Sequence, residues 1–374
     1  MAEKKAVNKV VEPTNEEIDA HVDQLVAKAQ VALSKFEEFT QEQVDYIVAK
    51  CSVAGLDAHG TLAEAAVNET GRGVFEDKAV KNLFACEYVT SNLRHLKTVG
   101  IINEDPLLGI TEIAEPVGVV CGIVPTTNPT STVIFKSLIC LKTRNPIIFS
   151  FHPSAHACSV MAAVVIRDAA IAAGAPEDCI QWLDLKSMYA TTALMKHPGV
   201  ATILATGGNA MVAAAYSCGK PALGVGAGNV PAYVEKTCVL PRAVNDIVLS
   251  KSFDNGMICA SEQAAIVDTE IYDAFMKEIK RFKVYFVNKE EKAKLETFMF
   301  GAVAYSDNVN AAKLNPNVVG KPATWIAEQA GFKVPEDTQI ICAECKEVGP
   351  NEPLTREKLS PVLAVLKAKN TDDG

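Results

Sequence analysis

Cys259 lies in a setting that suits a catalytic nucleophile. The residues around it read DNGMICAS from 254 to 261 and connect a predicted helix, 241–253, to a predicted strand, 263–267. A cysteine nucleophile needs access and a stabilised thiolate. A loop with a glycine and small residues gives that access and places backbone N–H groups nearby. The alternative is one more buried cysteine among eleven, and the local sequence leaves both interpretations open.

A second loop with chemical potential reads PTTNP over residues 125–129, between a predicted strand and a predicted helix. Ligands of open α/β sheets bind at the carboxyl ends of the strands, where this loop would lie. Pro129 suits the first position of a helix, and the amide of Asn128 could donate a hydrogen bond to a developing oxyanion. A capping Asn in a plain turn is the commoner use of such a residue and remains the alternative.

Two glycine-containing turns follow. The sequence ATGG at 205–208 ends a predicted strand and begins a predicted helix. Small residues there let a phosphate or a nicotinamide approach the backbone and the helix N-terminus, and a plain tight turn is the alternative. The sequence GVGAG at 224–228 precedes a strand, so it is not the dinucleotide fingerprint, which opens a helix. It predicts a backbone that passes close to another group.

No metal site is predicted. Cys342 and Cys345 form a single C-x-x-C pair, whereas zinc would need a second pair or histidines at ligand spacing. A redox or metal role is therefore the minority interpretation of a motif this weak. His152 and His156 are four residues apart but have no third ligand nearby, which favours surface or cofactor-side positions.

Strands and helices alternate in the part of the chain that carries these loops. Strands are predicted at 117–124, 146–151, 180–184, 201–205 and 230–235, and helices at 129–142, 154–173, 188–196 and 208–217. This alternation predicts right-handed βαβ units and a Rossmann-type parallel sheet, and the apolar strands fit a sheet covered on both faces. After about residue 240 it restarts with helix 241–253, strand 263–267 and helix 270–282. We expect an α/β protein with an NAD-binding domain at 1–245 and a catalytic α/β domain at 246–374, which lacks an obvious closing element.

The N-terminal part is predicted to be helical. Thr14 and Glu17 form a capping box at the start of the first helix, and apolar residues from Ile18 to Leu33 follow at helical spacing. Segments around 41–54, 58–70 and 76–95 are also predicted to be helices. Gly71 is expected to stop the third of these four.

Composition narrows the partners. The formal net charge is −9, and no cluster of Lys and Arg suggests nucleic acid. The N-terminus has no secretory signal pattern. No stretch offers the ~20 apolar residues of a membrane helix, because Arg167 and Asp168 interrupt the nearest one, 160–175. The cysteines have no disulfide framework, so reduced thiols in the cytoplasm are expected.

Taken together, these motifs resemble those of the aldehyde dehydrogenase superfamily. The strings IVPTTNPTSTVIFKSLI, ATGG, GVGAGNVP, SFDNGMICASEQ and EKLSP occur in the order of that family. They are most similar to the N-terminal part of the bifunctional aldehyde–alcohol dehydrogenases, over almost the whole chain. Five motifs in order are far more specific than one.

The resemblance implies roles by position. Cys259 matches the catalytic thiol, and Asn128 matches the side chain that donates to the oxyanion, assisted by the backbone N–H of Cys259. Glu357 matches the carboxylate that holds the nicotinamide ribose. The expected NAD-binding residues are Ile123, Val124, Pro125, Thr126, Thr127, Asn128, Thr206, Gly207, Gly208, Gly226 and Glu357. At Ser150 to Pro153 the chain lacks the Lys that NAD-dependent members carry for the adenosine ribose.

One departure concerns the fate of the thioester. Hydrolytic aldehyde dehydrogenases carry a Glu that activates water, and Gly224 stands at the corresponding position here. Glycine has no base, so the resemblance implies that coenzyme A removes the acyl group. The expected reaction is acetaldehyde, CoA and NAD to acetyl-CoA and NADH, through an acyl-cysteine. A hydrolytic NAD-dependent enzyme with a base elsewhere is the alternative.

A second departure concerns length. Full-length bifunctional relatives add an iron-dependent alcohol dehydrogenase domain for ethanol fermentation, and the aldehyde dehydrogenase fold itself normally continues beyond EKLSP. We therefore expect a fold truncated at its C-terminus. A homo-oligomer is expected, as are filaments in full-length relatives, and an inactive fragment that keeps only assembly contacts is a further alternative.

Overall fold

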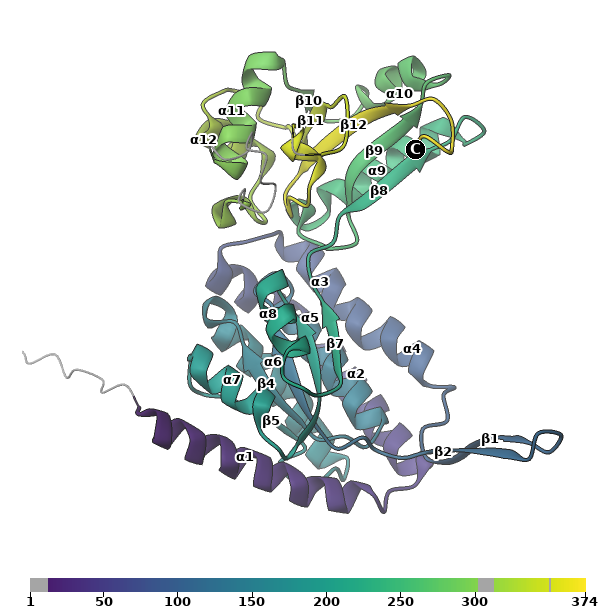
Figure 1. Cartoon of the computed structure of the whole chain (residues 1–374), viewed down its shortest axis with the longest axis vertical. Coiled ribbons are helices and arrows are strands. Elements are labelled where there is room, and N and C mark those ends of the chain that lie inside the picture. Colours follow the sequence, from purple (N-terminus) through teal and green to yellow (C-terminus); the bar gives the residue numbers. More distant parts are fainter. Residues whose placement is uncertain (1–12, 302–312, 350) are drawn as a thin grey trace, which may run out of the picture. The chain divides into compact units, whose positions relative to one another are not determined.

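The computed structural model describes residues 13–301, 313–349 and 351–374 (Figure 1). The chain divides into two compact units. The first comprises residues 1–56, 85–125 and 132–225, and the second comprises 57–84, 126–131 and 226–374. The second unit therefore begins earlier than the expected boundary at residue 245, which falls inside a helix, and it includes two segments from earlier in the chain.

A five-stranded parallel sheet forms the centre of the first unit. Its order is β5-β4-β3-β6-β7, where β3 is Val119–Val124, β4 Ile147–Phe151, β5 Ile180–Trp182, β6 Val200–Thr206 and β7 Ala222–Val225. All six residues of β3 are buried, as expected for a strand covered on both faces. Because the chain leaves β3 in one direction toward β4 and later returns to the other side for β6, a topological switch point lies between β3 and β6.

Helices cover this sheet. They are α1 (Asn15–Phe36), α5 (Pro129–Lys142), α6 (His156–Ala172), α7 (Met188–Lys196) and α8 (Asn209–Tyr216). The apolar faces of α1 and α7 pack with β3 and β6 in one core cluster, and α1 begins with the predicted Thr14–Glu17 capping box. The stretch Pro153–Ala172 is the single described helix long and apolar enough to cross a membrane. Its residues Ala162, Ala163 and Ile166 are fully buried, so the core of this unit uses its apolarity.

Two predictions for the N-terminal part were wrong. Helix α2 (Gln41–Thr70) is continuous where two helices were expected, because Gly55 does not break it. A Cβ at Gly55 would lie 2.6 Å from Cys86 Sγ, so this glycine admits the π-helical turn Phe84–Tyr88, which precedes α4 (Val89–Leu93). The sequence also gave no sign of the hairpin of β1 (Gly100–Asp105) and β2 (Ile110–Ala114), whose apolar residues do not alternate cleanly with polar ones.

The second unit has its own five-stranded parallel sheet, in the order β10-β11-β12-β9-β8. The strands are β8 (Val230–Val234), β9 (Glu262–Asp268), β10 (Val284–Phe286), β11 (Ile340–Glu344) and β12 (Val362–Ala368). Helices α9 (Leu240–Ser252) and α10 (Tyr272–Ile279) pack in one core cluster, and α11 (Lys289–Phe300) and α12 (Ala323–Ala330) in another.

Strand β12 corrects the expectation that this unit lacks a closing element. It lies between β9 and β11 and pairs with both. Of its seven residues only Lys367 is exposed. Strand β8 belongs to this sheet as well, through its pairing with β9, which explains why the unit begins at Gly226. Helix α3 (Phe75–Leu83) is also part of this unit.

Candidate active site

A cavity opens at the carboxyl ends of β3, β4 and β6 in the first unit. Its volume of about 530 Å³ lies within the range of small-molecule sites. Six predicted cofactor residues line it: Ile123, Val124, Pro125, Thr206, Gly207 and Gly208. The other predicted cofactor residues, Thr126, Thr127, Asn128, Gly226 and Glu357, belong to the second unit.

The start of α8 forms one wall of this cavity. Gly208 caps the helix without a side chain, and a Cβ placed there would meet nothing within 4 Å. The first N–H groups of α8 are thus accessible, as an anion such as a pyrophosphate requires. The small, largely apolar lining fits the adenosine and phosphate part of a dinucleotide. Ser150, which replaces the family's lysine, lies in the lining and bonds the hydroxyl of Thr191 at 2.7 Å.

The glycines of 224–228 let the backbone approach other groups, as predicted. In the first unit, a Cβ on Gly224 would lie 2.5 Å from Val212 Cγ1, so α8 packs directly on β7 at this residue. In the second unit, a Cβ on Gly228 would lie 2.9 Å from the carbonyl oxygen of Cys259. The glycine-rich segment therefore passes directly against the cysteine loop.

Cys259 is the only exposed cysteine among the described residues, and its loop has an unusual backbone. Asp254, Asn255 and Gly256 adopt the left-handed conformation in succession, with φ of 51°, 53° and 68°. Left-handed non-glycine residues cost free energy and persist only where contacts impose them. The Asn255 amide donates to the Gly320 carbonyl at 3.1 Å, and Asp254 is held more tightly still.

The remaining cysteines do not compete for this role. Eight of them are buried, and burial raises the pKa of Cys342 and Cys345 to about 12. These two thiols of the C-x-x-C pair are therefore protonated at neutral pH. Among the described residues no group of His, Cys, Asp or Glu could hold a metal ion. His156 Nε2 bonds the carbonyl of Leu183 at 3.2 Å, away from any such ligand set.

Asn128 is held by helix α3, which sequence reasoning did not connect to the site. The buried residues of α3 are Lys78, Lys81 and Asn82, and none of them is apolar. Lys81 Nζ donates to Asn128 Oδ1 at 2.7 Å, and Lys78 Nζ donates to the Thr127 carbonyl at 3.2 Å. Asn82 accepts a bond from the Thr130 hydroxyl at 2.8 Å. A polar helix face with no apolar counterpart was the available signal.

Asp254 joins the same helix to the cysteine loop. Its Oδ2 accepts from Lys81 Nζ at 2.5 Å and from Lys78 Nζ at 3.1 Å, and its Oδ1 accepts the Val74 N–H at 2.7 Å. Its own N–H donates to the carboxylate of Asp77 at 2.7 Å. Asp254 is fully buried, and both lysines are buried too, so the charges compensate one another inside the unit. These bonds hold Asp254 in its left-handed conformation.

Glu357 follows the same pattern of a partly occupied carboxylate. Its Oε1 accepts the Gly228 N–H at 2.8 Å. Burial raises the pKa of this carboxyl, while the Gly228 bond, Lys251 and Lys358 oppose that effect. Lys358 Nζ is satisfied by the carbonyls of Gln263, Leu354 and Arg356. The second oxygen of Glu357 bonds no described residue and is left for a ligand hydroxyl.

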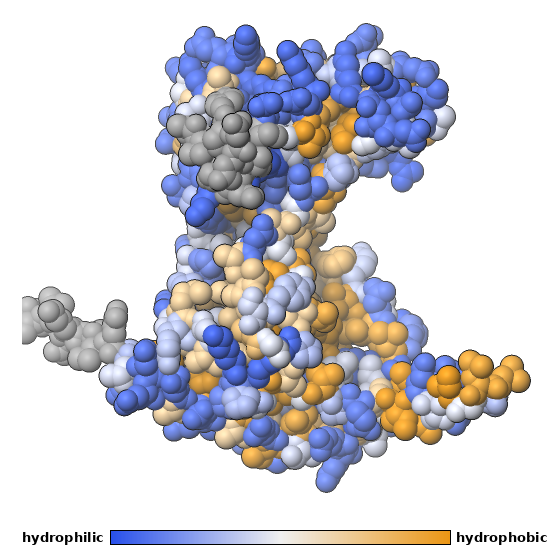
Figure 2. All heavy atoms as spheres, viewed as in Figure 1, coloured by the Kyte–Doolittle hydropathy of each residue, from blue (hydrophilic) through white to orange (hydrophobic). Residues whose placement is uncertain are grey.

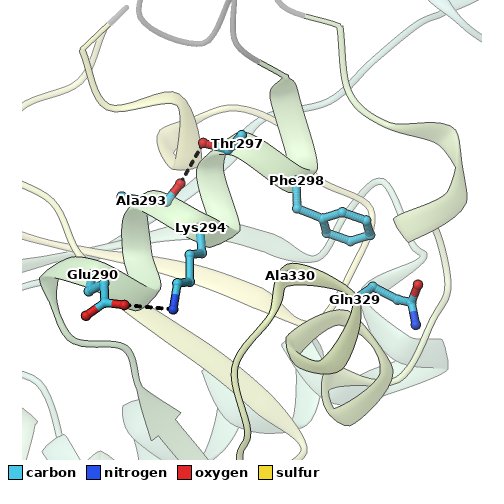
Figure 3. Close-up of a pocket in the computed structure, with 7 residues that line it drawn as sticks. All are labelled: Glu290, Ala293, Lys294, Thr297, Phe298, Gln329 and Ala330. Atoms are coloured by element: carbon cyan, nitrogen blue, oxygen red, sulfur yellow. Dashed lines mark hydrogen bonds and ion pairs between the residues drawn. The ribbon is translucent and has the colours of Figure 1, made fainter.

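One open hollow in the second unit offers no comparable chemistry (Figure 3). Glu290, Lys294 and Thr297 line it together with Phe298 and Gln329. Lys294 pairs with Glu290 at 2.7 Å, and the Thr297 hydroxyl donates to the Ala293 carbonyl, so these polar groups are already bonded within α11.

Each unit thus contributes a recognisable part of an enzyme. The first has a cavity for a dinucleotide at a sheet edge, and the second has an accessible thiol and an amide held by a buried cation. The chain belongs to the aldehyde dehydrogenase family, whose model matches residues 3–373.

Several named relatives are more specific. The chain is 71% identical to aldehyde-alcohol dehydrogenase 2 of Entamoeba histolytica over 96% of this chain and 41% of the relative. It is 49% identical to the bifunctional aldehyde-alcohol dehydrogenase of Escherichia coli K12 over 95% of this chain and 39% of the relative. The chain therefore spans well under half the length of these relatives and matches their N-terminal part.

Solved structures agree with this assignment. An acetylating aldehyde dehydrogenase from Geobacillus thermoglucosidasius has a TM-score of 0.90 and 44% identity, covering 97% of this chain and 78% of that one. A Rhodopseudomonas palustris propionaldehyde dehydrogenase with bound CoA and an acylated cysteine has a TM-score of 0.81 and 30% identity, covering 94% of this chain and 78% of that one.

Proposed function

We propose that this chain carries the CoA-acylating aldehyde dehydrogenase activity of its family, converting acetaldehyde, CoA and NAD into acetyl-CoA and NADH, and the reverse. The observation that carries the proposal is the exposed Cys259 in a loop tied through Asp254 and Lys81 to Asn128. A mobile or buried thiol would not suit covalent catalysis, whereas an accessible one held by buried ion pairs does.

In the proposed mechanism, the Cys259 thiolate attacks the aldehyde carbon, and the carbonyl oxygen becomes the alkoxide of a thiohemiacetal. The Asn128 amide and the backbone N–H of Cys259 donate hydrogen bonds to that oxygen. Bound NAD supplies the hydride acceptor. The acyl group remains on Cys259 as a thioester until the CoA thiolate attacks it, which releases acyl-CoA and restores the Cys259 thiolate.

The residues present fit NAD. The cavity at the sheet edge, with Gly207 and Gly208 at the start of α8, would hold the phosphates and adenosine. The free oxygen of Glu357 would take a ribose hydroxyl, and the buried Thr126 hydroxyl, which has no partner among the described residues, is available to the same ligand. Because Gly224 carries no carboxylate, water is not activated at that position, which favours transfer to CoA.

The test is NADH formation from NAD and acetaldehyde with and without CoA, with the acyl product identified. Turnover that needs CoA and yields acetyl-CoA is expected. NADH formed without CoA, together with acetate, would instead support a hydrolytic enzyme. Cys259→Ala should abolish turnover while NAD still binds, and Asn128→Ala should lower the rate by about 10²–10³, the usual loss for one oxyanion donor. Full activity in Cys259→Ala would remove the thiol from the mechanism.

We also propose that the chain forms homo-oligomers through the β1–β2 hairpin. Its side chains Ile101, Leu107, Leu108, Ile110 and Ile113 are all more than half exposed or nearly so, and Figure 2 shows them as an apolar arm. An exposed apolar patch of this kind marks an interaction site. Sedimentation of Leu107→Asp and Leu108→Asp should show a smaller species than wild type, and an unchanged one would exclude the hairpin. Filaments and a cytoplasmic location, which the free cysteines fit, are part of the same proposal.

A further inference from the structure

The orientation of the Asn128 amide is fixed from one side. Lys81 Nζ lies 2.7 Å from Asn128 Oδ1. An ammonium group has three donors and no acceptor, so it can bond only the oxygen of an amide. The opposite edge of the amide, with its two N–H donors, therefore points away from Lys81. Of those donors, Nδ2 makes one long bond of 3.2 Å to the Thr127 hydroxyl.

Lys81 is itself fully committed. Its three donors meet three acceptors: Asn128 Oδ1, Asp254 Oδ2 at 2.5 Å and the Met257 carbonyl at 3.2 Å. These acceptors come from the 126–131 segment and from both sides of Gly256 in the cysteine loop. Because the side chain is only 8% exposed, water does not replace these bonds. One buried cation thus sets the amide and the thiol loop in a single frame.

We propose that Lys81 is a positioning residue for the oxyanion site: it holds Asn128 with its N–H donors toward the substrate oxygen and strengthens their donation by polarising the amide through Oδ1. Chains of hydrogen bonds reinforce one another in this way at low local dielectric. A lysine at the amide oxygen excludes the flipped orientation, in which that oxygen would repel the developing alkoxide. This inference rests on the proposed function of Cys259 and Asn128.

The charges that face Lys81 keep it cationic at neutral pH. Burial lowers the pKa of its ammonium group to about 8, and Lys78 lowers it further, while Asp254 and Asp77 raise it. The ring of Phe253 lies 5.6 Å from Nζ, at the distance of a cation–π contact. Polarisation of Asn128 is therefore expected to weaken as pH rises through about 8.

A double-mutant cycle tests the inference on the whole chain. Lys81→Met and Asn128→Ala are made singly and together, and kcat and KM are measured for acetyl-CoA reduction by NADH. Lys81→Met alone should lower kcat by about tenfold to a hundredfold, the range for a lost bond to a charged group, with little change in the KM for NADH. In the Asn128→Ala background the same substitution should cost about twofold or less. Equal losses in both backgrounds would overturn the inference.

Lys78→Met is the matched control. It removes the other ion pair of Asp254 and the bond to the Thr127 carbonyl, but it does not touch the Asn128 side chain. Its effect on kcat should be the same in both backgrounds, whatever its size. Asp254 keeps one lysine and the Val74 N–H in either variant, so its carboxylate is not left unpaired. If Lys81→Met loses cooperative unfolding, Lys81→Gln runs the same cycle, with a smaller loss that is likewise absent from the Asn128→Ala background.

The pH dependence gives a second readout that a purely structural role would not move. The ratio of wild-type kcat to Asn128→Ala kcat should decrease as pH rises through about 8, since Cys259 titrates alike in both chains. A constant ratio from about pH 7 to 9 would contradict polarisation by Lys81. A wild-type chain without any CoA-dependent turnover would overturn the proposed function itself, whereas turnover with additive losses would overturn only the role of Lys81.

Discussion

Replacing Gly224 by alanine tests how closely α8 must pack on β7 for the cavity of the first unit to form. The added Cβ would lie 2.5 Å from Val212 Cγ1 and 2.8 Å from Tyr216 Cε2. Ordinary contacts between carbon atoms are ~3.5–4.0 Å, so α8 must retreat by about 1 Å or Val212 must leave its preferred rotamer. The Gly224 N–H also loses room for its 3.0 Å bond to the Tyr216 hydroxyl.

The expected loss follows from those contacts. Overpacking of this size lowers the free energy of unfolding by about 1–3 kcal/mol. Because Gly208, Met211 and Ala214 line the cavity from the same helix, a displaced α8 also changes the cofactor wall. We expect the dissociation constant for NAD to rise by about tenfold, which corresponds to ~1.4 kcal/mol.

The assay combines urea unfolding with calorimetric titration of NAD. The double variant Gly224→Ala with Val212→Ala removes the nearer of the two clashing side chains, and the half-exposed Tyr216 can swing into solvent. It should recover most of the NAD affinity relative to Val212→Ala alone. If Gly224→Ala binds NAD and unfolds like wild type, the close packing of α8 on β7 is not what shapes the cavity.

Three further outcomes are expected. The exposed thiol of Cys259 should account for the fast phase of iodoacetamide labelling, because burial slows the buried thiols such as Cys342; a fast phase that persists in Cys259→Ala would contradict this. Burial lowers the pKa of Lys136 from 10.5 to about 7, so between these values the unfolded chain binds more protons, and the unfolding free energy of wild type should rise with pH relative to Lys136→Met. An equal pH slope in urea unfolding of both chains would refute that sign. Thr14→Ala removes the capping box of α1 and should cost about 1 kcal/mol by the same method, while an unchanged midpoint would show that this helix end contributes nothing.

Local patterns predicted the elements that local chemistry controls. Helices α5 and α7 begin and end where their sequences predict, and the strands β3, β4, β5, β6, β8 and β9 differ from their predicted bounds by a few residues at most. Pro129 at the start of α5 and Ser187, whose hydroxyl caps α7, set these boundaries through contacts within a few residues.

Elements that depend on distant partners were missed. Strand β7 has only four residues, and its Gly224 makes sense only against α8. Gly55 stands inside a helix because Cys86, far along the chain, occupies the space of its Cβ. Local propensity cannot report a contact between residues this far apart, since tertiary packing overrides it.

The same distinction applies to the site. Cys259, Asn128 and Glu357 were predicted from motifs and their order, and their catalytic and cofactor roles stay predictions. Lys81 was missed because a lysine in a helix rich in charges is usually a solvated residue. Its burial depends on Asp254, which is 173 positions further along the chain.

The central position of β12 has a consequence for how the protein is made. The first unit has all its strands once Val225 has left the ribosome, but β9 and β11 cannot be joined until residues 362–368 emerge. At typical synthesis rates these events are separated by roughly ten to thirty seconds. During that interval the newborn chain holds a nucleotide-binding half beside an unassembled thiol loop. The protein therefore acquires its reactive cysteine environment last, after the surface that would receive the cofactor already exists.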